Sequence, residues 1–92
     1  MIGLVECECI IYDAGSLKEK RAVLQRVLTR IKQKFNVSIS EIDYHDTWQH
    51  TKFAIVAVTS AKLYTERELQ NVLKFIDSFP EIERTVTEFE WF

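Results

Sequence analysis

Apolar and polar residues alternate along the first dozen positions of the chain. The polar positions of residues 2–12 include Glu6 and Glu8, and the apolar positions around them are Val5, Cys7, Cys9 and Ile11. Successive side chains of a β-strand point to opposite faces, so this period of two predicts a strand with one face against a core.

The pattern then changes to that of a helix. Ser16 precedes Glu19 by three residues, and such a capping box satisfies two backbone N–H groups where a helix begins. The apolar residues that follow share one side of a helical wheel and predict a long buried stripe: Leu17, Leu24, Val27, Leu28, Ile31 and Phe35. We expect this helix to stop at Asn36.

A hairpin is predicted next. Residues 37–43 and 52–60 have the pattern of strands, and the polar residues 44–51 lie between them. Within the second of these strands the apolar run Phe53–Val58 does not alternate with polar residues. A strand of this kind is typically covered on both faces. Small side chains on a solvated face are the alternative, and the sequence leaves both open.

A second helix and a last strand complete the chain. A capping box formed by Thr65 and Glu68 predicts the start of the helix, and Pro80 prevents its continuation. The apolar face of this helix is predicted to comprise Leu69, Val72, Leu73, Ile76 and Phe79. Residues 82–91 are the last predicted strand.

The order β-α-β-β-α-β predicts the fold. With short links between the elements, this order is that of an α+β ferredoxin-like sandwich, a four-stranded antiparallel sheet with both helices on one face. The 92 residues suffice for one domain, residues 1–92. Hydrophobic residues make up 47% and charged residues 28% of the chain, which is typical of a folded domain.

The composition also bears on location and redox state. The longest uninterrupted apolar run has six residues, against the roughly 20 that a membrane-spanning helix needs. We therefore expect a cytoplasmic protein. Cys7 and Cys9 are two residues apart in a strand, which places them poorly for a mutual disulfide, and we expect two reduced thiols in the core.

Three short motifs add a family resemblance. They follow the first strand, follow the first helix and precede the third strand: Ser16-Leu17-Lys18-Glu19-Lys20-Arg21, Phe35-Asn36-Val37-Ser38 and Asp46-Thr47-Trp48-Gln49. In this order and spacing, over nearly the whole chain, they resemble the YlxP-like family, domain of unknown function 503. The resemblance implies a small bacterial ferredoxin-like protein with no assigned activity. The genes of such proteins often lie beside those of translation initiation and ribosome maturation factors.

Positive charge is concentrated in the first predicted helix. From Lys18 to Lys34 the chain has seven basic residues and one acidic residue, a net charge of +6, whereas the whole chain carries −2. The rest therefore carries −8. On a helical wheel the basic residues flank the apolar stripe, with Arg26, Arg30 and Lys34 on one side and Lys18, Arg21 and Lys32 on the other. Such a helix offers phosphate groups a positive surface, and we expect weak, salt-dependent binding.

Five of these side chains are our candidate partner-binding residues: Lys18, Lys20, Arg21, Arg26 and Arg30. An alternative stays open, because a surface helix rich in Lys and Arg can be solvated and paired with acidic neighbours. Lys20 and Arg21 could also lie along the sheet edge and pair with Glu41 or Asp43.

The polar loop of the hairpin contributes possible contacts through Trp48 and Gln49. An indole needs apolar cover and a partner for its N–H group, so Trp48 either anchors the hairpin or contacts a partner. His45, Asp46 and His50 share the loop, but their spacing matches no zinc pattern. We expect two solvated histidines, no metal site and no cofactor.

An enzymatic function is not favoured by these residues. Acylphosphatases share the predicted fold and bind phosphate through an Arg after the first strand and an Asn on the sheet, which draws attention to Arg21 and Asn36. Their Gly-rich loop pattern is missing here, because Gly15 stands alone and Asp13 would oppose an anion. We therefore name no catalytic residue.

The sequence favours a non-enzymatic bacterial module that docks on an anionic partner, such as a ribosomal subunit or RNA, through its basic first helix. The second interpretation is a homodimer. If the third strand is covered on both faces, its second face needs a shield, and Phe89, Trp91 and Phe92 add exposed apolar area near the end of the chain. The open sheet face would then serve assembly or hold a small ligand.

Overall fold

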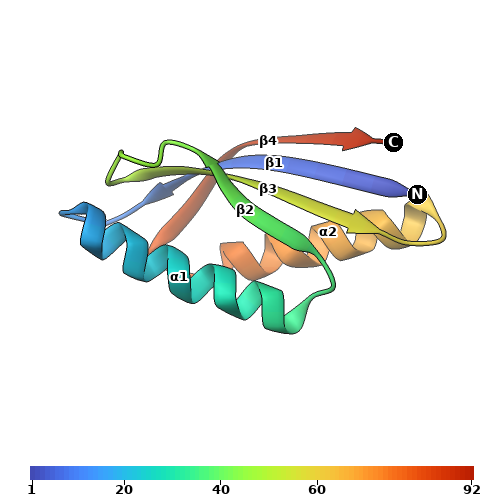
Figure 1. The fold of residues 1–92 in the computed structure, drawn as a ribbon, viewed down its shortest axis with the longest axis horizontal. Helices are drawn as coiled ribbons and strands as arrows, with labels where there is room; N and C mark the ends of the chain where they lie inside the picture. The colour runs from blue at the N-terminus through green and yellow to red at the C-terminus, as the bar shows by residue number, and fades with distance from the viewer.

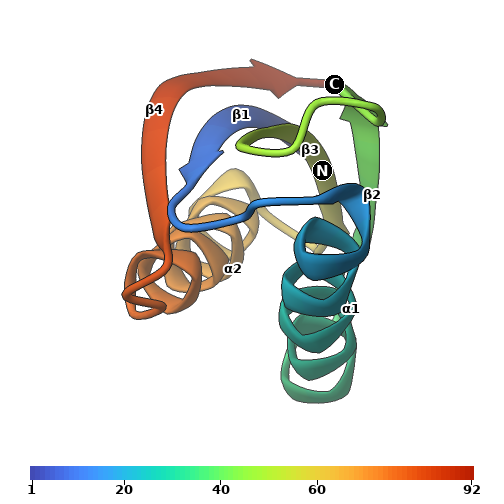
Figure 2. The ribbon, with the colours of Figure 1, turned by 90° about the vertical axis from the view of Figure 1, so that its left-hand side faces the viewer.

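Four antiparallel strands and two helices form a two-layer sandwich in the computed structural model, which describes residues 1–92 (Figure 1). The elements, in chain order, are β1 (Ile2–Ile11), α1 (Leu17–Lys34), β2 (Ser38–Asp43), β3 (His50–Val58), α2 (Lys62–Asp77) and β4 (Ile82–Trp91). The strand order is β2-β3-β1-β4, so β1 and β3 are central. Figure 2 shows both helices beneath the same face of the sheet, α2 on the β4 side and α1 on the β2 side. The predicted ferredoxin-like fold is confirmed.

The core lies between the sheet and the helices. Cys7 and Cys9 are fully buried and unbridged on the inner face of β1, as the alternation predicted. Along β3 the side chains of Phe53, Ile55 and Ala57 are buried, whereas Val56 and Val58 on the other face are 37% and 63% exposed. Of the two interpretations left open for this strand, the chain by itself shows the second, with small side chains on an uncovered outer face. Neither helix is long and apolar enough to cross a membrane.

The two helices begin differently. At α1, the Ser16 hydroxyl accepts a hydrogen bond from the Glu19 N–H group at 3.1 Å, which confirms the first capping box. The predicted second box is wrong, because α2 begins three residues before Thr65, and its N-cap, Ala61, makes no side-chain cap bond. Thr65 is buried, and its hydroxyl lies 2.7 Å from the Thr59 hydroxyl. The Thr65 hydroxyl, which the sequence pattern assigned to a helix cap, is instead hydrogen-bonded to Thr59.

Gly3 leaves room for the Trp91 ring and for the Thr65 side chain of α2 against the first strand. It pairs with Trp91 across the β1–β4 ladder. A Cβ atom at this position would lie 2.7 Å from the Trp91 ring and 2.6 Å from the Thr65 methyl group. Glycine in a strand interior often marks such a close approach. The indole of Trp91 therefore packs across Gly3 and covers one end of the core.

Candidate functional site

The basic residues of α1 lie in different environments. Leu24, Val27 and Ile31 form the buried side of the helix, and Lys20 lies on this same side, four residues before Leu24. The other candidates of the helix are exposed: Lys18, Arg21, Arg26 and Arg30. Because residues four apart lie on one face of a helix, Lys20 points into the molecule.

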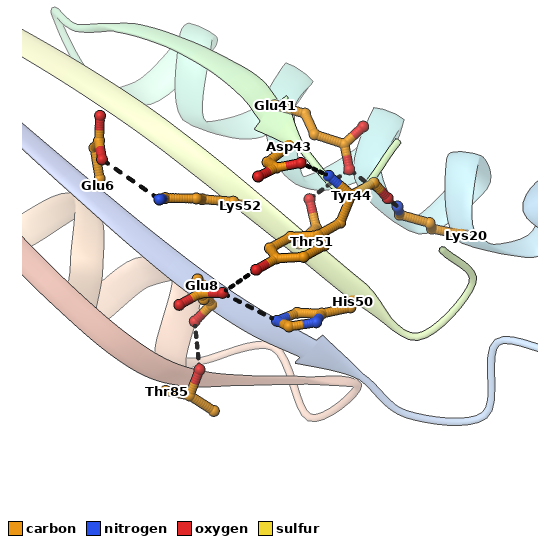
Figure 3. A network of polar contacts seen from close by, with 10 residues as sticks. All are labelled: Glu6, Glu8, Lys20, Glu41, Asp43, Tyr44, His50, Thr51, Lys52 and Thr85. Carbon is orange, nitrogen blue, oxygen red and sulfur yellow. Dashed lines mark hydrogen bonds and ion pairs between the residues drawn. The ribbon is translucent and has the colours of Figure 1, made fainter. Parts of the chain in front are cut away.

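Lys20 is part of an internal polar network (Figure 3). Only 1% of its side chain is exposed, and its ammonium group donates to the Tyr44 carbonyl oxygen and lies 3.1 Å from Glu41 Oε2. The Thr51 hydroxyl donates to this same oxygen at 2.6 Å. Of the alternatives left open for Lys20, the structure shows the pairing with Glu41. The structure therefore removes Lys20 from the proposed binding surface, because its charge fastens α1 to the β2–β3 hairpin.

The turn after β2 is held by Tyr44. This residue has a φ of 63°, in the left-handed region that side chains rarely adopt, and its N–H group donates to Asp43 Oδ1 at 2.7 Å. Its hydroxyl donates to Glu8 Oε1 at 2.7 Å, and its ring stacks on His50 with centroids 4.1 Å apart. The hydrogen bond to the Glu8 carboxylate raises the pKa of Tyr44, because it stabilises the neutral phenol.

A carboxylate, a phenol and an imidazole thus meet on the open side of the sheet. His50 Nε2 lies 3.5 Å from the same Glu8 oxygen that accepts from Tyr44 (Figure 3). None of these three groups lines any of the four surface cavities. We interpret the cluster as a structural contact that holds the β2–β3 hairpin against β1.

The α2-facing flank of α1 borders a groove. Arg26 pairs with Glu81 at 2.7 Å, the Arg30 guanidinium lies 5.8 Å from the centroid of the Phe79 ring, and the Lys34 ammonium lies 4.8 Å from that of Phe75. Here a cavity of about 550 Å³ opens between the helices, and we call it the inter-helix groove. Its lining consists of Lys34, Phe35, Asn71, Lys74, Phe75 and Ser78. Two lysines thus stand beside two aromatic rings that pack edge to face.

Charge is divided between the two layers of the fold. We refer to α1 and α2 together as the helix layer. Nine of the twelve basic residues are exposed on it: Lys18, Arg21, Arg26, Arg30, Lys32, Lys34, Lys62, Arg67 and Lys74. Since α2 has equal numbers of basic and acidic residues, the helix layer carries the +6 of α1, and the sheet and loops carry −8. The molecule is therefore electrically polar from one layer to the other.

Comparison with known proteins identifies the family of the chain. A family model described as "Protein of unknown function (DUF503)" matches residues 2–89. The chain belongs to this family. It is also 74% identical over 92 residues, 100% of both chains, to a Bacillus subtilis (strain 168) protein described as "Uncharacterized protein YlxP". These descriptions name no ligand, so a functional argument for this DUF503 protein rests on its surface.

The loop candidates of this DUF503 protein have different environments. The Ile11 N–H group donates to the Gln49 carbonyl oxygen at 3.0 Å, and the Gln49 side chain donates to the Ala14 carbonyl oxygen at 3.3 Å. Gln49 therefore anchors the hairpin to the loop before α1. Trp48 is 51% exposed. Of the two loop candidates, only Gln49 uses its side chain to hold the loop in place.

Two features of this DUF503 protein were not predicted from the sequence. Lys20 has the spacing of a core position relative to Leu24, and this signal could have separated it from the exposed basic residues. The inter-helix groove had no such signal, because the sequence does not show that Phe35 and Phe75 meet across the two helices.

Proposed function

We propose that this DUF503 protein is a non-enzymatic docking module that binds an anionic partner, a ribosomal subunit or its RNA, through the helix layer. One observation carries the proposal: nine of the twelve basic side chains are exposed on the helices, whereas the sheet and loops are acidic. A phosphate backbone approaching the helices is attracted, and one approaching the open sheet face is repelled.

The groove side of the helix layer is the strongest part of this surface. Lys34 and Lys74 line the inter-helix groove, Arg30 lies one helical turn before Lys34 on α1, and none of the three forms an ion pair. Arg26 is already paired with Glu81, so a phosphate would have to compete with that carboxylate. Lys18 and Arg21 extend the positive surface around the start of α1.

The number of contacts sets the expected salt dependence. With three to four phosphate contacts, the logarithm of the affinity falls with the logarithm of the salt concentration with a slope of about −3 to −4. An increase from about 50 to about 200 mM salt then weakens binding by roughly 100-fold. Binding of this kind is reversible, as expected of a factor that associates with an assembly and leaves it.

The test is sedimentation of the tagged protein in a bacterial lysate through a sucrose gradient, at low and at high salt, with and without nuclease. We expect co-migration with a ribosomal subunit at low salt and release at high salt or after nuclease treatment. Arg30→Glu should weaken co-migration, whereas Lys52→Glu, the same charge change on the open sheet face, should not. Circular dichroism checks that both variants are folded. Protein that stays at the top of every gradient, or equal effects of the two variants, would contradict the proposal.

A homodimer is the second candidate function. Its support is the exposed apolar end of the open sheet face, where Ile2, Val58 and Phe92 are 44%, 63% and 68% exposed. Sedimentation equilibrium of the purified protein decides it. A monomer at micromolar concentration would exclude this candidate, and a dimer that Val58→Ser dissociates would support it.

A further inference from the structure

The open face of the sheet has an apolar end and an acidic centre. At the apolar end Ile2 pairs with Val58 on one side and exchanges two backbone hydrogen bonds with Phe92 on the other. The next row across the sheet contains Val56, Leu4 and Glu90. The face therefore changes from apolar to acidic along the length of β1.

The acidic centre is made of glutamates on two neighbouring strands. Glu6 lies directly opposite Glu88 in the β1–β4 ladder, and Glu90 lies one row away opposite Leu4. Like charges directly opposite each other destabilise a sheet. Glu6 forms an ion pair with Lys52, whose ammonium lies 3.6 Å from its carboxylate (Figure 3). Glu88 and Glu90 form no ion pair. The arrangement therefore has more negative than positive charge.

These carboxylates surround a small recess. A cavity of about 20 Å³ is lined by Leu4, Glu6, Glu88 and Glu90. This volume accommodates about one water molecule, or an ammonium group of similar size. The side chain of Leu4 provides an apolar contact for a methylene stem, and the glutamates surround the position of a charged head group. Lysine and arginine side chains combine such a stem with such a head group.

We propose that the open sheet face docks a basic segment of a partner protein, with apolar side chains against Ile2, Val56 and Val58 and Lys or Arg side chains among the glutamates. Charge complementarity selects this occupant. A nucleic acid is repelled by Glu6, Glu88 and Glu90. A second copy of this chain would bring the same carboxylates, so it could pack only at the apolar end.

The proposed docking surface is independent of the helix layer. The sheet separates the two, and its open face points away from both helices (Figure 2). An anionic partner beneath the helices and a basic segment on the sheet can therefore bind at the same time. Failure of one proposal does not affect the other.

The experiment uses three synthetic peptides of equal length and the full 92-residue chain labelled with ¹⁵N. The first peptide alternates lysine with leucine, the second replaces each lysine by glutamate, and the third replaces each leucine by serine. We expect the lysine–leucine peptide to shift the amide signals of Leu4, Glu6, Val56 and Glu88 most strongly. The glutamate peptide should shift none of them, and the lysine–serine peptide should bind more weakly because it lacks the apolar contacts.

Variants locate the charge contacts. Glu88→Gln combined with Glu90→Gln removes two carboxylates from the face and should weaken binding of the lysine–leucine peptide about tenfold, since two exposed ion pairs are lost and each contributes modestly. The matched control, Asp46→Asn with Glu66→Gln, removes two carboxylates elsewhere and should leave the affinity unchanged. Equal weakening in both pairs would overturn the proposal. So would shifts confined to the helix layer, or shifts of the same amides on raising the protein concentration alone, which would identify a second copy as the occupant.

Discussion

Replacement of Lys20 by methionine tests whether this charge is structural. Methionine keeps an unbranched side chain of similar bulk but removes the ammonium group that lies 3.1 Å from Glu41 and donates to the Tyr44 carbonyl oxygen. Glu41 is only 14% exposed, so its carboxylate would lose its nearest positive charge in a poorly solvated position. Removing one partner of a buried ion pair costs about 3–5 kcal/mol, and the partial exposure of Glu41 reduces this to about 2–3 kcal/mol.

The assay is urea unfolding followed by circular dichroism, with the free energy of unfolding extrapolated to water. Lys18→Met is the matched control, because Lys18 is exposed on the same helix and its replacement should change stability by less than about 0.5 kcal/mol. A second variant, Lys20→Met with Glu41→Gln, removes both charges but keeps an acceptor for the buried Thr51 hydroxyl, and it should recover most of the loss. If Lys20→Met were as stable as Lys18→Met, Lys20 would not fasten α1 to the hairpin, and it would return to the candidate binding residues.

Three further predictions concern the sheet. Gly3→Ala places a methyl group 2.6 Å from a threonine methyl of α2 and should lower the melting temperature, whereas Gly15→Ala, whose nearest contact would be 3.4 Å away, should change it little. Glu88→Lys replaces a like-charge pair with Glu6 by an opposite-charge pair and should stabilise the fold by about 0.2–1 kcal/mol in urea unfolding; a loss of stability would contradict the proposed repulsion. The pKa of Tyr44 is higher in the folded protein than its ordinary value of 10. The hydrogen bond to Glu8 should therefore contribute its full stabilisation below pH 10, and this stabilisation should be lost as the pH rises above the folded pKa. An ultraviolet titration compared with Tyr44→Phe measures this, and a titration of that tyrosine at or below pH 10 would refute it.

Local patterns predicted the fold because nearly every element has a clear signal. The alternation of β1 and the apolar stripe of α1 fixed their type and inner faces, and β4 has the predicted bounds of residues 82–91. The start of α2 was misplaced, because the Thr65–Glu68 spacing also arises by chance inside a helix. A capping hydroxyl and a buried hydroxyl look alike in sequence, and only the contact with Thr59 distinguishes them.

The candidate site was predictable only in part. The excess of basic residues in α1 is visible in the sequence. Whether each basic side chain is exposed or forms an ion pair depends on which element packs beside it. Lys20 meets Glu41 from the next strand, and Arg26 meets Glu81 from beyond the second helix. The acidic recess of the open face depends on the register that places Glu88 opposite Glu6. The register of two strands is set by tertiary packing, so the sequence of either strand alone does not predict it.

The most direct test of the proposed docking is the affinity of the purified protein for purified ribosomal subunits, measured over a range of salt concentrations. We expect reversible binding with a slope of about −3 to −4 on logarithmic axes, and a slope about one less negative for Arg30→Glu. Lys52→Glu should have the slope of the unaltered protein. Absence of binding at low salt, or affinity that does not depend on salt, would contradict the claim that the helix layer docks on an anionic partner.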